Sequence, residues 1–596
     1  MVEPEFHQEN THSEAGGRVI TSALQWKSNP CDPDRTAVLE SELGLSREAA
    51  ILMRRLGYTD PEEGRAFLDP RLQSLDDPFR ITNMDRAVTR VRAAMSRAED
   101  ILVFGDYDVD GVTSTAFLVD ILKIFGVTPR FVVPKRLEEG YGLSMGALDR
   151  SFQESTRPQL VIAVDCGTNS LEEVAWLRQK GVDIVIIDHH TSKEKVPADT
   201  ILVNPHVFDS PSEPWANLCT VGLVFKFVHA LLKDLRSEGD DLALQIRLKD
   251  YLDLAALGTL ADLVPLTGEN RILAKSGLAH LRETQRTGLN ALFSVCGMRL
   301  GNVVSPFDIS FRLGPRINAS GRLADAALPI DLLLSNDWQN CLNIARTLDE
   351  FNRERQDIER EIVREAERMV AETQNNAPGI VLYHPDWHPG VVGIVASRIS
   401  KKYHRPCLVL GAESDLAKGS GRSVAGIDLV EALTPCAWLL EHWGGHPAAV
   451  GVSARPENLD ALRDAFCSSI LSIVSGEIAG PEIEIACWSD PAALTERLLA
   501  ELERLAPFGQ GNPEPVFGVR KVVLDREPVA FGKGHYRFQI ETAPGTRIQG
   551  VAWKQADRPI PAFTPVDLAL RFAWNHWNGR STPQVSLVDW RPAAPV

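Results

Sequence analysis

The chain has 596 residues, of which 44% are hydrophobic and 24% charged, and its formal net charge at pH 7 is -17. It is too long for one hydrophobic core, so we expect several domains of an ordinary soluble globular protein. The acidic net charge gives no global sign of nucleic-acid affinity, although a local basic groove can lie on an acidic protein. Nine dispersed cysteines without a CxxC pair argue against a disulfide framework or a zinc cluster and favour a reducing compartment.

The first segment, residues 1 to about 20, is polar and acidic, and we predict a disordered tail there. It has no apolar core of the kind that a signal peptide needs. No apolar run in the chain approaches membrane-spanning length. We therefore expect a cytoplasmic protein that does not enter a membrane.

Helical and strand patterns alternate through the first third of the chain. Because such alternation is typical of a parallel sheet flanked by helices, we predict an α/β fold. The predicted helices cover residues 46–68, 85–97, a segment after Gly111, and 171–180, and the predicted strands cover 101–104, 130–133, 160–164 and 183–187.

Three of these apolar strands end in acidic residues or histidines. Asp106, Asp108 and Asp110 follow the first, Asp165 follows the third, and Asp188–His190 follow the fourth. Alternate residues of an extended strand end point the same way, so we expect the first three carboxylates to converge. Taken alone, this stretch fits either a metal site or a solvated acidic turn.

The combined set favours a metal site. Ligands of open parallel sheets bind beyond the carboxyl ends of the strands, where all these residues are expected. Asp262, near the end of a later helix within residues 218–286, adds another carboxylate. Carboxylates with one or two imidazoles suit two Mg²⁺ or Mn²⁺ ions, which together support in-line displacement at phosphorus. A histidine that does not bind metal can stay cationic and hold the phosphate.

The second half of the chain contains three further segments. Residues 337–374 have helical apolar spacing and many Glu–Arg pairs, which indicates a long solvated spacer helix. A second α/β segment runs from about residue 380 to 454. From about residue 481, a short helix precedes alternating strands separated by glycine and proline, which suggests a small barrel.

Several stretches resemble a known family. VFGDYDVDG, AVDCG, IDHH and GTLADLVPL are similar to the four motifs of the DHH phosphoesterase superfamily. RLEEGYGL, GPRINASGRL, WHPGVVGIVASRI, KGSGRSVAGIDL, GGH and PFGQGNPEPVF resemble the RecJ family of bacterial single-strand-specific 5′→3′ DNA exonucleases. The similarity runs in order from about residue 69 to residue 553.

The resemblance implies a domain plan and an activity. The plan is a tail and lead-in (1–45), a DHH catalytic domain (46–336), a connecting helix (337–376), a DHH-associated substrate-binding domain (377–455) and an OB-like nucleic-acid-binding barrel (456–596). The implied activity is metal-dependent hydrolysis of single-stranded DNA from its 5′ end to mononucleotides, in DNA repair and recombination. A phosphodiester hydrolase of this kind would use two Mn²⁺ or Mg²⁺ ions.

The resemblance also assigns roles to the strand-end residues. Asp108 and Asp110 would be the principal ligands of the first motif, and Asp106 would replace a histidine that the wider superfamily carries where this chain has Phe104. Asp165 would bridge both metals, and His189 and Asp262 would complete the second site. His190 would contact the scissile phosphate, and Asp188 would orient a histidine.

Other motif residues are implied to bind the DNA strand. Arg136, which alternatively pairs with Glu138 or Glu139, and Tyr141 would hold a terminal phosphate and a base. GSGRS resembles an anion nest in which Gly419 and Gly421 permit a tight backbone. The remaining predicted contacts are Arg316, Asn318, Arg322, Ser420, Arg422, Ser423 and His446, and the aromatic residues of the barrel, Phe531, Tyr536, Phe538 and Trp553, would either stack bases or pack the core.

The implied partners are single-stranded DNA with a 5′ end, a helicase and a single-strand-binding protein, and we expect a monomer. Three alternative functions compete with this one. A nuclease of oligoribonucleotides or cyclic dinucleotides is disfavoured by the C-terminal barrel, and a pyrophosphate or polyphosphate phosphatase by the RecJ-like stretches. A catalytically inactive scaffold is disfavoured because every expected carboxylate and histidine is present.

Overall fold

The structure is a computed structural model that describes residues 24–29, 33–140, 142–192, 195–323, 326–474, 478, 480–577 and 580–593. The chain divides into two compact units. One contains Leu56–Arg353 and Leu502–Glu514, and the other contains the segments before residue 56, Glu354–Glu501 and Pro515–Val596. The predicted tail, residues 1–20, lies outside the described residues.

The first of these units is built on a five-stranded sheet of order β3-β2-β4-β5-β6. All of its neighbouring strands are parallel. The strands are β2 (Ile101–Gly105), β3 (Arg130–Val132), β4 (Leu160–Val164), β5 (Asp183–Ile187) and β6 (Ile201–Val203). The chain proceeds from β2 to β3 on one side and then to β4, β5 and β6 on the other. The strand order therefore reverses between β2 and β4, where parallel sheets bind their ligands.

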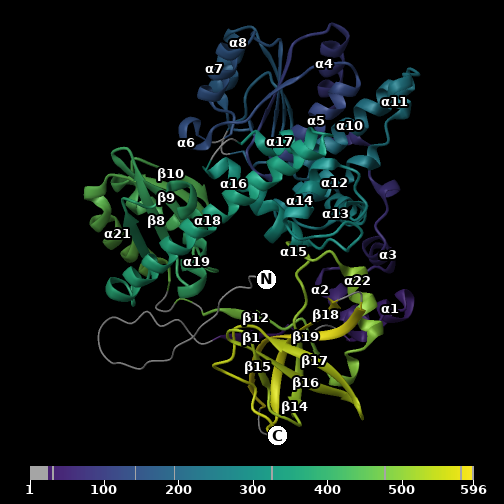
Figure 1. The fold of residues 1–596 in the computed structure, drawn as a ribbon, viewed down its shortest axis with the longest axis vertical. Helices are drawn as coiled ribbons and strands as arrows, with labels where there is room; N and C mark the ends of the chain where they lie inside the picture. Colours follow the sequence, from purple (N-terminus) through teal and green to yellow (C-terminus); the bar gives the residue numbers. More distant parts are fainter. Residues whose placement is uncertain are drawn as a thin grey trace. The chain divides into compact units, whose positions relative to one another are not determined.

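Helices cover both faces of this sheet, as Figure 1 shows. Successive strand residues face opposite ways, so Val103 and Ile162 pack with α4, α5 and α10, whereas Phe104 and Ala163 pack with α7 and α8. These helices are α4 (Met84–Ser96), α5 (Val109–Ile124), α7 (Met145–Glu154), α8 (Leu171–Gln179) and α10 (Thr220–Ser237). The buried sheet explains why its central strands are continuous apolar runs.

A further set of helices in this unit follows the parallel sheet in sequence. They include α12 (Leu252–Ala261), α13 (Gly268–Leu281), α14 (Thr287–Val295), a π-helical turn (Ile309–Leu313), α16 (Gly314–Leu323), α17 (Leu328–Leu334) and the start of α18 (Trp338–Thr373). The predicted spacer helix over 337–374 is therefore α18. The predicted helix over 46–68 is wrong as one element: it is α2 (Arg47–Arg55) and α3 (Pro61–Leu68), separated because Gly57 has φ 95° and Asp60 caps the second helix.

The second unit contains a five-stranded mixed sheet of order β10-β11-β9-β8-β7. Its strands are β7 (Ile380–His384), β8 (Cys407–Glu413), β9 (Leu416–Arg422), β10 (His442–His446) and β11 (Ala449–Ala454). One face packs on α19 (Pro389–Tyr403) and on the C-terminal part of α18. The opposite face packs on α20 (Leu429–Leu433) and α21 (Leu459–Ile473). This is the predicted second α/β segment.

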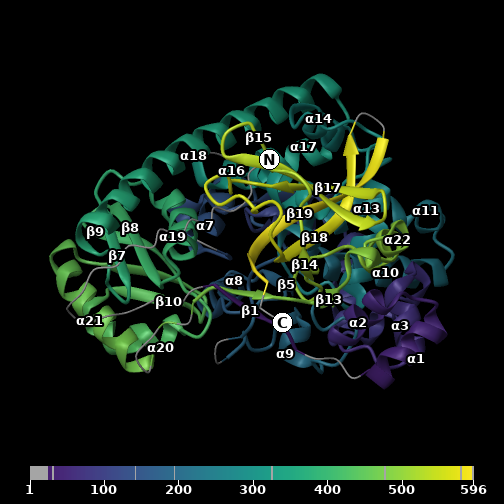
Figure 2. The same ribbon diagram turned by 90° about the horizontal axis from the view of Figure 1, so that it is seen from below.

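A seven-stranded sheet forms the C-terminal part, in the order β13-β14-β18-β19-β17-β16-β15. Figure 2 shows β14, β17, β18 and β19 of this sheet close together. The strands of the sheet are β13 (Cys487–Ser489), β14 (Phe517–Val522), β15 (Val529–Phe531), β16 (His535–Ala543), β17 (Thr546–Ala552), β18 (Val566–Trp577) and β19 (Arg580–Pro592), and α22 (Glu496–Leu505) is the predicted short helix. The fold class expected from the sequence, a parallel-sheet α/β domain with a second α/β domain and a C-terminal β domain, is confirmed.

None of the described helices combines the length and the apolar character that a membrane crossing requires. The eight cysteines within the described ranges are all free thiols, seven of them buried. They pack as small apolar residues, in agreement with the absence of paired motifs in the sequence.

Candidate metal centre

The turn after β2 positions Asp106, Asp108 and Asp110 differently from the prediction. The strand ends at Gly105, and α5 begins at Val109. The carboxylate of Asp108 caps the helix and accepts hydrogen bonds from the backbone N–H groups of Asp110 (3.0 Å) and Gly111 (3.1 Å). The predicted alternation along an extended strand end is therefore wrong, because a strand-to-helix turn separates Asp106 and Asp108 from Asp110.

Asp110 is held from a second helix. Its carboxylate is buried and accepts hydrogen bonds from the backbone N–H groups of Thr220 (2.7 Å) and Val221 (2.8 Å), at the start of α10. Helix N-termini leave such donors unpaired and carry partial positive charge, so they stabilise a carboxylate.

Asp165 follows β4 directly and is also buried. Its backbone has φ 65°, a left-handed conformation that is uncommon for residues other than glycine and often occurs at functional sites. The hydroxyl of Thr220 donates a hydrogen bond of 2.9 Å to Oδ1 of this carboxylate. Thr220 therefore contacts both Asp110 and Asp165.

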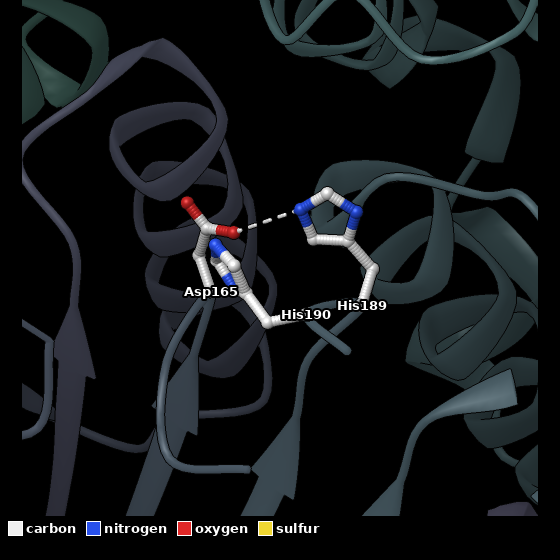
Figure 3. A group of neighbouring side chains, drawn as sticks. All are labelled: Asp165, His189 and His190. Carbon is white, nitrogen blue, oxygen red and sulfur yellow. Dashed lines mark ion pairs between the residues drawn. The ribbon is translucent and has the colours of Figure 1, made fainter. Parts of the chain in front are cut away.

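The imidazole of His189 lies at the centre of the carboxylates. Its Nε2 atom is 3.6 Å from Oδ1 of Asp165, 3.9 Å from Oδ2 of Asp110 and 3.5 Å from Oδ2 of Asp262, the C-cap residue of α12. Figure 3 shows the carboxylate of Asp165 directed toward this ring. Side chains from β4, β5, α5 and α12 thus converge on one point beyond the sheet.

The converging atoms form three groups of the size that holds a metal ion. Within each group, the potential ligand atoms lie within 4.8 Å of one another. Asp106, Asp108 and Asp165 form one group, and Asp110, His189 and Asp262 form another. Asp165 also groups with His189 and His190. Oxygen and imidazole donors in this arrangement fit hard divalent cations.

The electrostatics of the carboxylates fit a site for cations. Burial and the charge of Asp108 raise the pKa of Asp110 to about 7, and burial and the charges of Asp110 and Asp108 raise the pKa of Asp262 to about 9. Burial and the neighbouring carboxylates also raise the pKa of Asp165 well above its ordinary value. Divalent cations relieve this repulsion and favour the ionised forms.

The two neighbouring histidines are in opposite protonation states. Burial and the positive charge of His190 lower the pKa of His189 to about 4, which leaves its imidazole neutral with a lone pair for a metal. Partial burial acts to lower the pKa of His190, but the hydrogen bond with Asp188 and its charge outweigh burial and raise the value to about 9. His190 is therefore a cation at neutral pH.

The carboxylate of Asp188 forms hydrogen bonds with both histidine residues. It is buried and accepts hydrogen bonds from the backbone N–H groups of Thr168 (3.0 Å) and His189 (2.8 Å), as well as 2.7 Å from Nδ1 of His190. Burial acts to raise the pKa of Asp188, but its bond with His190 and the histidine charges hold the pKa well below the usual range. It is a fixed carboxylate that faces His190 and is itself a member of none of the three groups.

Four residues that support this cluster have no signal in the sequence. Thr220 holds Asp110 and Asp165, and Thr168 holds Asp188. The amide of Asn204 donates to the Thr168 hydroxyl (2.8 Å) and to the His190 carbonyl (2.9 Å), and Nδ1 of His206 contacts the His189 carbonyl. These residues belong to no acidic or histidine-rich motif, so only tertiary contacts reveal them.

The predicted DNA contacts of the first unit, residues 56–353 and 502–514, have mixed environments. Tyr141 and the side chain of Arg136 lie outside the described residues. Arg316, Asn318 and Arg322 lie on α16 and are half-buried. The guanidinium of Arg316 pairs with Asp349 at 2.8 Å and donates to the Arg312 carbonyl at 2.6 Å, so its position is set within the unit. Their contact with DNA stays a prediction.

The predicted anion nest is wrong in conformation. Residues Gly419–Arg422 are part of β9, a central strand paired with β8 and β11. The glycines allow close packing instead, since a Cβ atom on Gly419 would lie 2.0 Å from the Val409 carbonyl oxygen. Ser420 and Arg422 are half-buried, and the hydroxyl of Ser423 donates to the Ile427 carbonyl. His446 ends β10 and is exposed.

The barrel aromatics divide between the core and a partly exposed group. Tyr536 and Phe538 are buried and pack the core. The rings of Phe531 and Trp553 lie 5.7 Å apart, edge to face, and both contact His535. Of the four, Phe531 and Trp553 are only partly buried, and their contact with bases stays a prediction.

Three parts of the chain match known domain families. Residues 100–259 match the sequence model of the DHH family, N-terminal domain, and residues 376–471 match the DHHA1 domain. Residues 485–589 match the RecJ OB domain. The parallel sheet with its acidic strand-end cluster is thus a DHH-type domain, and a DHHA1 domain follows it in the chain.

Relatives that match over most of the chain identify the family within this class of domains. The single-stranded-DNA-specific exonuclease RecJ of Bacillus subtilis is 33% identical over 578 residues, which are 96% of this chain and 71% of the relative. The Escherichia coli protein of the same name is 32% identical over 93% of this chain and 96% of its own length. The crystal structure of RecJ from Thermus thermophilus with Mn²⁺ superposes with a TM-score of 0.81 and 28% identity, covering 96% of this chain and 80% of that one. The chain belongs to the RecJ family of single-stranded-DNA-specific exonucleases.

Proposed function

We propose that this chain hydrolyses single-stranded DNA from its 5′ end and releases mononucleotides, using two Mn²⁺ or Mg²⁺ ions. The observation that carries the proposal is the position of His189, whose Nε2 atom lies 3.5 to 3.9 Å from the carboxylates of Asp110, Asp165 and Asp262. The neutral imidazole and the crowded, buried carboxylates form the donor set that two such cations require. The Thermus thermophilus relative has been crystallised with Mn²⁺ and with Mg²⁺.

Each candidate ligand group would hold one ion. Asp106, Asp108 and Asp165 would hold the first, and Asp110, His189 and Asp262 would hold the second. Asp165 would be within reach of both, because its carboxylate also faces His189. When bound, such a pair of ions supplies Lewis acidity, which activates water and offsets negative charge that develops at phosphorus.

His190 binds the scissile phosphate. Its ring is half-exposed at the edge of the cluster, and it is cationic because it pairs with Asp188. A charge-assisted hydrogen bond from the imidazolium to a phosphate oxygen places the phosphorus against the ligand groups. Asp188 acts through His190, because its bond to Nδ1 leaves Nε2 as the donor available to the phosphate.

Recognition of a single strand and its 5′ end requires residues beyond the cluster. We assign contacts with the terminal phosphate and the strand to Arg136, Tyr141, Arg316, Asn318 and Arg322 of the catalytic unit. Ser420, Arg422, Ser423 and His446 of the second α/β domain are proposed for the same role. Phe531 and Trp553 are proposed to stack bases, since stacking is tolerant of sequence.

The biological setting is proposed on the same basis. The enzyme acts in DNA repair and recombination in the bacterial cytoplasm, as a monomer. A helicase would supply the single strand, and a single-strand-binding protein would hold it open. The division into a lead-in, a catalytic domain, a connecting helix, a DHH-associated domain and an OB-like domain, with bounds 1–45, 46–336, 337–376, 377–455 and 456–596, stays a prediction.

The test uses one oligonucleotide in four forms: single-stranded or blunt duplex, each labelled at the 5′ or the 3′ end. With Mn²⁺, we expect a labelled mononucleotide at once from the 5′-labelled single strand, a gradually shortening ladder from the 3′-labelled one, and little product from duplex. Cleavage of short oligoribonucleotides or pyrophosphate instead of these strands would support the competing activities. The absence of any hydrolysis would support a scaffold.

A further inference from the structure

We propose that Thr220 is a positioning residue that couples the two ligand groups of the metal centre. The inference rests on the proposed two-ion site and adds a residue outside all the acidic and histidine motifs. Thr220 is fully buried at the first position of α10. It acts on the reaction through the carboxylates that it contacts.

One residue holds one carboxylate from each group. The backbone N–H of Thr220 donates 2.7 Å to Oδ2 of Asp110, which belongs to the group with His189 and Asp262. Its side-chain hydroxyl donates 2.9 Å to Oδ1 of Asp165, which belongs to the group with Asp106 and Asp108. The two carboxylates come from different elements, α5 and the end of β4. Thr220 therefore fixes their separation.

Helix α10 is held in place by other contacts, so Thr220 keeps a fixed position relative to the two carboxylates. Its next N–H, that of Val221, also donates to Asp110, at 2.8 Å. Further along the helix, the buried Nζ of Lys226 lies 2.7 Å from Oε1 of Glu269 and donates to the Asp76 carbonyl at 2.7 Å. Thr220 is thus held by its helix, so its hydroxyl cannot follow Asp165 if that side chain turns.

The hydroxyl of Thr220 holds Asp165 in place against repulsion from the neighbouring carboxylates. Asp165 is surrounded by like-charged carboxylates, which repel it whenever it is ionised. The oxygen that accepts from Thr220 is the same Oδ1 that lies 3.6 Å from His189. Without the donor, the carboxylate can rotate away from its neighbours and from His189. Partners of this kind typically change metal affinity by about 10- to 100-fold when they are removed.

The experiment measures Mn²⁺ binding to the full chain by titration calorimetry, together with the Mn²⁺ concentration that half-saturates cleavage of single-stranded DNA. Thr220→Val removes the hydroxyl at nearly constant shape and keeps the backbone donor. Thr220→Ser restores the hydroxyl. We expect Thr220→Val to weaken Mn²⁺ binding by about 10-fold or more, with the rate at saturating Mn²⁺ changed less, and Thr220→Ser to recover most of the affinity.

The chain supplies a matched control in Thr284. Its buried hydroxyl donates 2.7 Å to Oδ2 of the buried Asp253, so Thr284→Val removes the same kind of bond. Asp253 lies nine residues before Asp262 on the α12 segment, about 13 Å along the helix axis. We expect Thr284→Val to lower stability as Thr220→Val does and to leave Mn²⁺ affinity unchanged.

The outcomes separate this inference from the proposed function. If the wild-type chain neither binds Mn²⁺ nor cleaves DNA, the proposed function fails. If the wild type does both and Thr220→Val binds Mn²⁺ as tightly, the inference is overturned. It is also overturned if Thr220→Ser is as weak as Thr220→Val, or if Thr284→Val loses the same affinity. Should Thr220→Val not fold, Thr220→Ala against Thr220→Ser gives the same comparison.

Discussion

Nδ1 of His190 lies 2.7 Å from Oδ1 of Asp188, a carboxylate that is almost completely buried. The pair makes His190 a cation near neutral pH, while its neighbour His189 remains neutral. Adjacent residues of one chain segment are thereby fitted for opposite tasks. One imidazole can donate a lone pair to a metal, and the other can donate a charged hydrogen bond to a phosphate.

Removing the charge of Asp188 is expected to shift the pH dependence of the reaction. In Asp188→Asn, the pKa of His190 falls from about 9 toward its ordinary value. Because the imidazolium exists below this pKa, activity that needs it is lost as the pH rises through the pKa, and the loss begins at lower pH in the variant. We also expect kcat/KM to fall by about 10- to 100-fold at neutral pH. The measurement is kcat/KM against pH with Mg²⁺.

The control for this prediction is Asp183→Asn at the start of the same strand. Asp183 is exposed and pairs with Arg90 at 2.7 Å, away from the cluster. Its substitution should leave unchanged both kcat/KM at neutral pH and the pH at which kcat/KM falls on the alkaline side of the profile. If kcat/KM of Asp188→Asn and of the wild type declined at the same alkaline pH, the role given to His190 would be contradicted.

The metal-free protein is expected to lose stability as the pH rises. Unfolded aspartates ionise near pH 4, whereas folded Asp110 and Asp262 keep their protons to about pH 7 and about pH 9. The folded state thus binds more protons between these values, so its free energy of unfolding falls as the pH increases. With EDTA, the unfolding temperature should decrease from pH 5 to pH 8, and Mn²⁺ should raise it most at pH 8.

Substituting the carboxylates tests the origin of this trend. Asp110→Asn combined with Asp262→Asn removes two of the groups that repel one another, and should flatten the metal-free dependence on pH. A dependence with the wild-type slope in the double variant would assign the effect to other residues.

Gly258 is expected to be intolerant of even one added methyl group. It lies on α12 beside Asp110, and a Cβ atom there would lie 2.6 Å from both Thr113 Oγ1 and Val221 Cγ1 and 3.0 Å from Asp110 Oδ1. Gly258→Ala should lower stability by about 1–3 kcal/mol through overpacking and weaken Mn²⁺ binding, because Asp110 must move. Denaturant unfolding and calorimetric titration measure the two effects.

Gly146→Ala serves as the comparison for Gly258→Ala. On α7, the added atom would lie 3.4 Å from Glu139 Cγ, an ordinary contact, so the higher helix propensity of alanine should leave stability unchanged or increased. Equal effects of the two substitutions would rule out a specific role for space beside Asp110.

The buried pair between Lys226 and Glu269 is expected to behave as a unit. Both side chains are fully buried, and burial lowers the pKa of Lys226 and raises the pKa of Glu269. Lys226→Met alone leaves Glu269 without its charged partner, which should cost about 3–5 kcal/mol of stability. The double variant with Glu269→Met should be more stable than Lys226→Met. Additive losses in a double-mutant cycle would contradict this coupling.

The local pattern of apolar and charged residues predicted the strands of the parallel sheet in the first unit well. Leu160–Val164 and Asp183–Ile187 have the predicted bounds because each is a short apolar run ended by a charged residue and buried on both faces. Parallel strands place their carboxyl ends at one edge, so the sequence also predicted that Asp106, Asp165 and His189 would meet. The structure brings these residues together with Asp110 and Asp262.

Tertiary contacts account for what the sequence did not predict. Thr220 lies 110 residues from Asp110 and 55 residues from Asp165, and no local pattern connects them. GSGRS suggested a nest because glycine permits tight turns, but here glycine permits close strand packing. The same composition serves both conformations, and the neighbouring strands decide between them.

The most direct test of the central claim compares the wild-type chain with Asp110→Asn on a 5′-labelled single strand in the presence of Mn²⁺. Asp110 is buried and belongs to the group with His189 and Asp262, so Asp110→Asn removes a negative charge from the proposed ligand set while keeping the size of the side chain. We expect the wild type to release labelled mononucleotide and the variant, folded by circular dichroism, to release almost none. A variant as active as the wild type would contradict a reaction centred on this cluster.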